Sequence, residues 1–272
     1  MDADELAVAV ALGLVQGLLE WLPVSSEGSV ALALTATGET GLSATQFALF
    51  LHAGTAVAAL TFYRGNVAAI LRSVPDWRPD GAFGEERADI TFYAIATLVS
   101  GVVGMAAYVA LESIASELTG GAFVAAIGAL LVVTGLVQRG ASRWGLGERT
   151  TPDATDAVLV GVMQGFALLP GVSRSGTTVS ALLLRGHDGE GALELSFVLS
   201  IPASLGAGLL VVVTEGIPTI SPAAAAVALA VSAVVGYLSV GALVAVVRRV
   251  AFWGVCVGFG ALAVVGGAVL LA

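Results

Sequence analysis

Apolar segments long enough to cross a lipid bilayer recur along the whole chain. In chain order, the predicted spans are residues 45–63, 91–111, 121–138, 194–213, 223–247 and 250–271. A helix of about 20 apolar residues crosses roughly 30 Å of hydrocarbon. Only 11% of the residues are charged, whereas about a quarter are charged in soluble domains. The sequence therefore predicts an all-α, polytopic membrane protein whose six spanning helices form a single domain over residues 1–272.

Two further apolar blocks are each interrupted by a polar turn and are too short on either side to span cleanly. The first covers about 5–22 and resumes at 30–37, and the second covers about 154–169 and resumes until about residue 184. Irregular backbone at membrane depth is tolerated only where protein or water covers it. We therefore predict that each block forms a re-entrant helical hairpin with a polar tip.

The two interrupted blocks resemble each other when the sequence is shifted by 148 residues. Six identities fall within 16 residues, placing Gly13, Gln16, Gly17, Val24, Ser25 and Gly28 on Gly161, Gln164, Gly165, Val172, Ser173 and Gly176. Three predicted spans separate the blocks, so the second copy must be upside down. This pattern predicts an inverted-topology repeat, with halves of about 1–140 and 150–272 and with polar tips that face each other. The glycine pairs, four residues apart, predict close helix packing.

The distribution of positive charge predicts the orientation in the membrane. All eleven basic residues are arginines, and the formal net charge is −9. Ten of the arginines fall in loops that lie on one face of this layout, at 64–90, 139–153, 185–193 and 248–249. The positive-inside rule then places these loops in the cytoplasm and both termini outside a plasma membrane. The loops carry no basic stripe, which argues against a nucleic-acid partner.

The eleventh arginine, Arg174, lies within the polar turn between two apolar segments. A charged residue at the bilayer centre costs about 2.5–3.5 kcal/mol even on mild insertion scales, which makes it a candidate functional residue. Its planar donors suit phosphate or carboxylate oxygens, and a helix N-terminus beside it would add to the attraction. The neighbours expected to contact this anion are Gly171, Ser173, Ser175, Gly176, Thr177 and Thr178. The alternative is a structural ion pair of Arg174 with Glu20 or Glu27.

The first polar tip offers a different set of groups. Gln16 and Glu20 are four residues apart and therefore share a helix face. A buried carboxylate must be paired, protonated or bound to a metal, and Mg²⁺ or Ca²⁺ would accept oxygens from both side chains and from a substrate. A hydroxyl of Ser25 or Ser26 could attack phosphorus, although helix capping explains either serine equally well. Ser25 and Ser29 are further candidates for contact with the substrate.

Three other side chains need an interpretation. His52 lies inside a predicted span, where a hydrogen-bonded core role and a site role remain equally open. His187 follows Arg185 in a predicted cytoplasmic loop, and we expect it to be solvated. Cys256 is the single cysteine and is expected to be a small packing residue.

These motifs resemble those of the undecaprenyl-diphosphate phosphatases of the bacitracin-resistance type. The first family motif, Glu or Gln followed by three residues and Glu, matches Gln16 and Glu20, and the second, Pro-Gly-x-Ser-Arg-Ser-x-x-Thr, matches residues 170–178 in full. The resemblance implies hydrolysis of the terminal phosphate of a polyprenyl diphosphate with a divalent metal. The products would be inorganic phosphate and the monophosphate lipid carrier, which is recycled for cell-envelope or glycan synthesis.

The resemblance also implies roles for individual residues. Glu20 and Gln16 would serve metal binding or acid–base chemistry, Ser26 would be the nucleophile, and Arg174 would bind the diphosphate together with Ser173 and Thr178. Many members have a histidine where this chain has Ser29. This departure leaves Glu20 or a metal-bound water as the expected base.

Two other classes of function compete with the enzyme. A polyprenyl-phosphate flippase or another anion transporter is the main alternative, because the inverted repeat is a transporter architecture. A structural membrane scaffold would leave the intramembrane arginine without a purpose. The expected partners are a polyprenyl diphosphate lipid and the bilayer, and a homodimer is an open alternative for the oligomeric state.

Overall fold

In the computed structural model, every regular element in the described part of the chain is a helix, and that part contains no strand. The described residues are 3–36, 41–84, 87–115, 118, 120–141, 147–216, 221–247 and 252–271. Three arginines used above to orient the chain, Arg143, Arg248 and Arg249, lie outside these ranges.

Within these described ranges, six of the helices are long and apolar enough to cross a membrane. They are α3 (Gly41–Phe62), α5 (Ala88–Ala115), α6 (Gly120–Ala141), α9 (Gly189–Thr214), α10 (Pro222–Val247) and α11 (Phe252–Leu271). Each coincides with one of the six predicted spans, whose number and helical type are thereby confirmed. The chain is a multi-pass membrane protein.

Both interrupted blocks consist of two short helices joined by a turn. The first holds α1 (Ala3–Leu19) and α2 (Ser26–Ala36), and the second holds α7 (Ala154–Phe166) and α8 (Arg174–Leu184). At 1.5 Å per residue, none of these helices reaches roughly 30 Å. The interruptions therefore fall where the polar turns were predicted. We call residues 20–29 the first tip and residues 170–178 the second tip.

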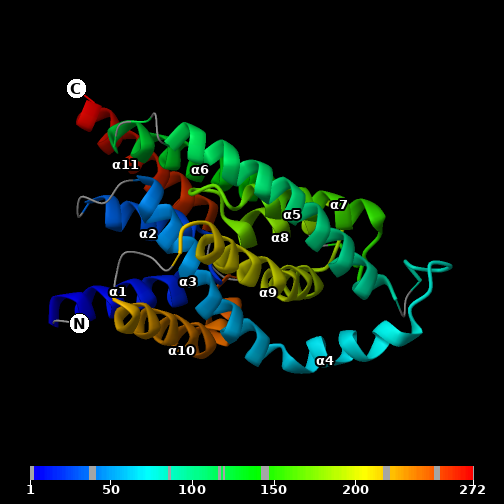
Figure 1. The fold of residues 1–272 in the computed structure, drawn as a ribbon. Helices are drawn as coiled ribbons and strands as arrows, with labels where there is room; N and C mark the ends of the chain where they lie inside the picture. Colours follow the sequence, from blue (N-terminus) through cyan, green and yellow to red (C-terminus); the bar gives the residue numbers. More distant parts are fainter. Residues whose placement is uncertain are drawn as a thin grey trace.

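Four helix pairs build the bundle: α1 packs on α10, α7 on α5, α3 on α9 and α6 on α11 (Figure 1). Glycines allow the closest approaches. A Cβ atom added to Gly17 would lie 2.9 Å from backbone atoms of Gly236 and Ser232 on α10. A Cβ added to Gly165 would lie 2.6 Å from Val103 on α5. The packing role predicted for the paired glycines is confirmed.

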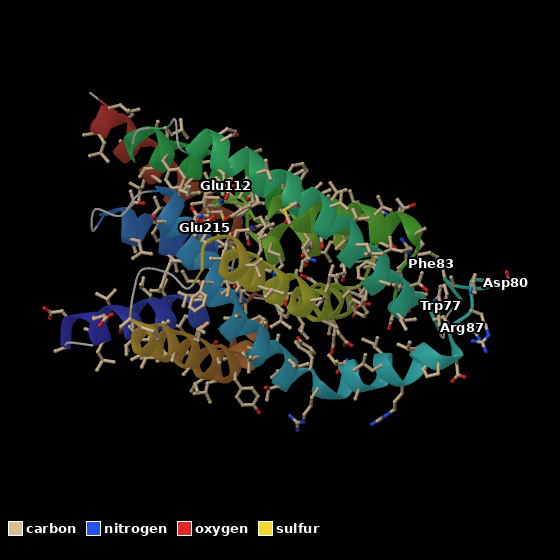
Figure 2. The ribbon with its side chains drawn as sticks, in the orientation of Figure 1. Trp77, Asp80, Phe83, Arg87, Glu112 and Glu215 are labelled. Atoms are coloured by element: carbon tan, nitrogen blue, oxygen red, sulfur yellow. The ribbon has the colours of Figure 1, made fainter. Side chains whose placement is uncertain are left out.

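The connection between α3 and α5 contains more structure than the surface loop predicted for residues 64–90. It includes the helix α4 (Arg64–Ser73), which has no buried residue, and a 3-10 turn over Val74–Asp76. In Figure 1 the beginning of α1 and the end of α11 lie at one end of the bundle, while α4 runs toward the other. Figure 2 labels Trp77 and Arg87 at this second end.

A buried carboxylate ties the beginning of α7 to the end of α8. Asp156 is completely buried, and it accepts hydrogen bonds from Arg149 Nη2 at 2.9 Å and Arg185 Nε at 2.7 Å. His187 Nε2 lies 3.0 Å from the same carboxylate, and the His187 side chain is fully buried. The expectation of a solvated His187 is therefore wrong, because the turn after α8 folds back onto α7.

We predict that Gly17→Val destabilises the protein by about 1–3 kcal/mol, because the added methyl groups overpack the contact with α10. Thermal unfolding of purified protein in detergent measures the effect. Gly258→Val is the matched control, since nothing lies within 4 Å of a Cβ at this position of α11. Equal unfolding temperatures for the two variants would contradict the packing role.

A second prediction concerns pH. Burial raises the pKa of Asp156, but the hydrogen bonds from His187 and Arg185 outweigh burial and hold this pKa well below its ordinary value. The lowered pKa contributes stability that is complete above about pH 5 and is lost as pH falls below about 4. Asp156→Asn should therefore cost about 1.5–3 kcal/mol at pH 7, with a difference from wild type that narrows only below pH 4. Denaturant titrations from pH 3 to 7 test this, and a difference that narrows already at pH 6 would refute it.

Candidate active site

The first and second tips meet inside the bundle, as the repeat predicted. Arg174, the first residue of α8, forms an ion pair with Glu20, the first residue after α1. Ser175 Oγ donates to the Leu22 carbonyl at 3.0 Å, and the Gly171 amide donates to Ser25 Oγ at 3.0 Å. Contacts between both backbones and side chains therefore fix the two tips against each other.

The ion pair between Arg174 and Glu20 is buried, with 8% and 5% of the two residues exposed. It is the structural pair that we weighed for Arg174, and it does not use all of the guanidinium. Only Nη2 binds Glu20, whereas Nη1 is buried with no hydrogen-bond partner. A buried, charged donor without a partner is costly. Arg174 can therefore bind a further anion without giving up Glu20.

The Glu20 carboxylate collects donors from its own half of the chain. Gln16 Nε2 donates to Glu20 Oε2 at 2.8 Å, and Ser26 Oγ donates to the same oxygen at 3.0 Å. The helix face predicted for Gln16 and Glu20 is thus observed. Gln16 Oε1 is buried without a partner. The Ser26 hydroxyl lies beside a carboxylate that can take its proton.

His52 on α3 is the residue of this site whose role the sequence left open. Its Nε2 atom lies 2.8 Å from Glu27 Oε1 and 3.3 Å from Glu20 Oε2. Its Nδ1 atom lies 2.8 Å from the Ala48 carbonyl, which can only accept, so Nδ1 carries a proton. The Nε2 atom therefore lies where it can exchange a proton with either carboxylate. The sequence did contain a signal for this role, because a titratable side chain inside an apolar span is a candidate functional residue.

The remaining groups of the first tip hold the backbone. Ser25 Oγ accepts from the Gly28 amide at 3.0 Å and therefore caps α2, and it also lies 3.2 Å from Glu27 Oε2. Ser29 Oγ donates to the Ser25 carbonyl at 2.9 Å, within its own helix. Capping thus describes Ser25, whereas Ser26 faces Glu20. Contact of Ser25 and Ser29 with a substrate stays a prediction.

The hydroxyls of the second tip support the first turn of α8. Ser173 Oγ caps the helix by accepting from the Gly176 amide at 3.1 Å. Thr177 Oγ1 donates to the Ser173 carbonyl at 2.9 Å, and Thr178 Oγ1 donates to the Arg174 carbonyl at 2.8 Å. These bonds hold the helix N-terminus, with its free amides, beside the guanidinium. The predicted contacts of Ser173, Ser175, Thr177 and Thr178 with an anion remain predictions.

Two glycines of the second tip lie close against α6. Gly171 adopts φ +100°, and a Cβ there would lie 2.5 Å from the Ile127 carbonyl. A Cβ on Gly176 would lie 2.5 Å from Gln138 Nε2. The turn and the close approach to the α6 backbone therefore require glycine at 171, whereas a side chain at 176 would displace the Gln138 amide.

A cavity of about 310 Å³ adjoins the ion pair. Arg174, His52 and Glu27 line its charged part, and the remaining wall comes largely from α5 and α9 and is mostly apolar, with side chains such as Met105 and Leu210. This division suits an amphiphilic ligand with an anionic head and a hydrocarbon tail.

The fold and the site define a polytopic membrane protein that holds an arginine, two carboxylates and a histidine against a mostly apolar cavity. A family model described as bacitracin resistance protein BacA matches residues 9–265. The chain belongs to this family.

Relatives match over almost the full length. A protein of Haloarcula marismortui named undecaprenyl-diphosphatase is 60% identical over 267 residues, which cover 97% of this chain and 98% of the relative. Proteins with the same name from Methanococcoides burtonii and Methanopyrus kandleri are 39% and 40% identical, and each alignment covers at least 95% of both chains.

We predict that breaking the ion pair destabilises the fold. Glu20→Gln and Arg174→Gln should each cost about 3–5 kcal/mol, because each leaves an uncompensated buried charge. The double variant should cost less than the sum of the two, since it leaves neither charge alone. Unfolding titrations in detergent measure all three. Arg72→Gln, at an exposed position of α4, is the control and should change stability by less than about 0.5 kcal/mol. Strict additivity of the two single variants would contradict the coupling.

Proposed function

We propose that the protein hydrolyses undecaprenyl diphosphate, or a related polyprenyl diphosphate, to the lipid monophosphate and inorganic phosphate. The observation that carries this proposal is the buried Arg174, whose Nη1 lacks a partner, at a cavity whose wall is mostly apolar. The BacA family and the names of the relatives support the same activity. The reaction returns the lipid carrier to cell-envelope or glycan synthesis and confers resistance to bacitracin.

Arg174 and the N-terminus of α8 bind the terminal phosphate in this proposal. The guanidinium has a free donor group, and the helix amides and dipole favour an anion at the same place. Charge that develops on the phosphoryl oxygens is stabilised by groups already in position, which is the main catalytic device in phosphoryl transfer.

Ser26 is the proposed nucleophile, and Glu20 is its base. The Ser26 hydroxyl gives its proton to Glu20 and attacks the terminal phosphorus, so that the bond to the bridging oxygen breaks and the lipid monophosphate leaves. Water then attacks the phosphoserine, which releases inorganic phosphate and restores the hydroxyl. His52 Nε2 lies within reach of both Glu20 and Glu27 and can hold the transferred proton. This imidazole stands in for the histidine that many members have at the position of Ser29.

A divalent cation, Mg²⁺ or Ca²⁺, is the proposed cofactor. The described residues contain no group of three or more His, Cys, Asp or Glu side chains arranged to hold a metal ion. The unpartnered Gln16 Oε1 and the neighbouring Glu20 are nevertheless hard oxygen donors, and the diphosphate would complete the set. The cation would neutralise charge on the diphosphate.

The proposed architecture is an inverted repeat of two re-entrant hairpins, with both termini outside. The helix contacts support it. The repeat relates α1 to α7 and α10 to α5, and the structure has the matching contacts, with α1 packed on α10 and α7 packed on α5. In Figure 1, α4 runs to the end of the bundle opposite the beginning of α1, which suits a cytoplasmic position for its arginines. Every residue of the proposed site comes from a single chain, so the site does not depend on a second copy. A homodimer is therefore proposed independently of the site.

A polyprenyl-phosphate flippase or another anion carrier is the second candidate function. The exchange of helix contacts between the two halves favours it, since transporters share this symmetry. The two candidates differ in one product, which is inorganic phosphate.

Phosphate release from undecaprenyl diphosphate by the purified wild-type protein tests the enzyme. Arg174→Ala, Glu20→Ala and Ser26→Ala should each lower the rate at least about a hundredfold, because each removes a charge or group used in the transition state. A chelator should also lower the rate, and added Mg²⁺ or Ca²⁺ should restore it.

Matched controls are Arg72→Ala and Ser200→Ala, which remove an exposed guanidinium and a buried hydroxyl that bonds within α9 and does not line the cavity. Both should retain wild-type rates. Binding or translocation of the lipid without release of phosphate would refute the enzyme and support the carrier.

A further inference from the structure

The cavity beside the ion pair has a second polar wall that the proposed reaction does not use. Gln164 on α7 and Ser100 on α5 line it, together with Thr97 and Ser204. Gln164 is 4% exposed, and its Nε2 donates to Ser100 Oγ at 3.2 Å. Ser100 Oγ in turn donates to the Thr97 carbonyl at 3.0 Å. This wall lies between α5, α7 and α9, the three helices that supply its side chains.

The Gln164 amide is incompletely satisfied. Its Oε1 atom is buried with no hydrogen-bond partner, and leaving a buried polar atom unpaired is costly. Exchanging the amide oxygen and nitrogen does not remove the deficit. Ser100 would then donate to Oε1, and the amide N–H groups would lack an acceptor. In either orientation, Gln164 has one polar end without a protein partner at the wall of the cavity.

The sequence repeat gives this amide a counterpart. Gln164 aligns with Gln16 at the shift of 148 residues, and Gln16 Oε1 is also buried without a partner. Two repeat-related glutamines thus have the same unpaired atom, one beside Glu20 and one at the cavity wall. The unpaired amide oxygen in each half marks two polar positions that one extended ligand can occupy.

We propose that Gln164, oriented by Ser100, binds the inner phosphate of the lipid diphosphate, the phosphate that remains on the lipid after hydrolysis. The inference rests on the proposed function. In a polyprenyl diphosphate, the inner phosphate is covalently placed between the terminal phosphate and the hydrocarbon chain. With the terminal phosphate at Arg174 and the chain against the apolar wall, the inner phosphate lies in the cavity between them. Gln164, with its N–H groups turned into the cavity, is an uncharged donor there, together with the hydroxyls of Thr97 and Ser204. In this orientation the Ser100 hydroxyl donates to Gln164 Oε1 and holds the amide in place.

Uncharged donors also suit release of the product. A lipid monophosphate held by amide and hydroxyl groups is bound less tightly than one held by a guanidinium, because hydrogen bonds between charged partners are about twice as strong. The two phosphates therefore have different binding partners, with Arg174 holding the one that becomes inorganic phosphate. Substitutions at Gln164 should consequently affect the lipid monophosphate and leave inorganic phosphate unaffected.

The test measures binding by titration calorimetry, with farnesyl monophosphate and inorganic phosphate as separate probes of the purified full-length protein. Gln164→Leu should raise the dissociation constant for farnesyl monophosphate about tenfold and Ser100→Ala about threefold. Neither variant should change the dissociation constant for inorganic phosphate. Ser200→Ala is the matched control, because its hydroxyl bonds to the Phe197 carbonyl within α9 and does not line the cavity.

Unchanged farnesyl monophosphate binding in Gln164→Leu would overturn the proposal, and so would equal losses for both probes. The inorganic phosphate titration also reports whether each variant is folded, and Ser100→Ala supplies a second reading if Gln164→Leu does not fold. Because binding is measured without turnover, the outcome is separate from that of the proposed hydrolysis. Absence of phosphate release from the wild type would refute the hydrolysis alone.

Discussion

The ion pair between Arg174 and Glu20 is the interaction on which the rest of the site depends. Neither charge is stable alone in a membrane interior, so each requires the other tip to be in place. Once paired, Glu20 also orients Gln16 and Ser26. The pair is therefore structural and chemical at once, and the two alternatives weighed for Arg174 do not exclude each other. Because Nη1 has no partner in the protein, Arg174 can bind a ligand in addition to neutralising Glu20.

The scaffold around the pair holds the backbone of both tips. Thr134 Oγ1 on α6 donates to the Gly171 carbonyl at 3.1 Å, and one helical turn later Gln138 Nε2 donates to the Pro23 carbonyl at 2.6 Å. One rigid helix thus satisfies carbonyls that the irregular turns leave open, which backbone at membrane depth requires. Close contacts of α1 with α10 and of α7 with α5 then set the depth of each tip. The tips are thus positioned by contacts with α5, α6 and α10, which carry none of the groups proposed to react.

Most of the fold followed from the sequence because hydrocarbon allows few solutions. Long apolar runs must be helices, and polar interruptions must be covered by protein. The α4 helix was missed because its ten residues are too polar to resemble a span, and the prolines that follow mark the segment as a surface connection. His187 was misjudged for a related reason: its neighbours in sequence are polar, but the turn after α8 buries it against Asp156. Cys256 is buried, as expected of a packing residue.

The sequence by itself determined that this is a helical membrane protein, that two polar tips interrupt it, and that an intramembrane arginine must have a partner. It also placed Gln16 and Glu20 on one helix face, since that relation depends only on a spacing of four residues. Only the tertiary structure decided that Glu20 is the partner, that His52 joins two carboxylates, and that the hydroxyls of the second tip mainly support α8. These relations connect residues that lie far apart in the chain or on opposite sides of a turn. They depend on how helices pack, and no local pattern in the sequence encodes that packing.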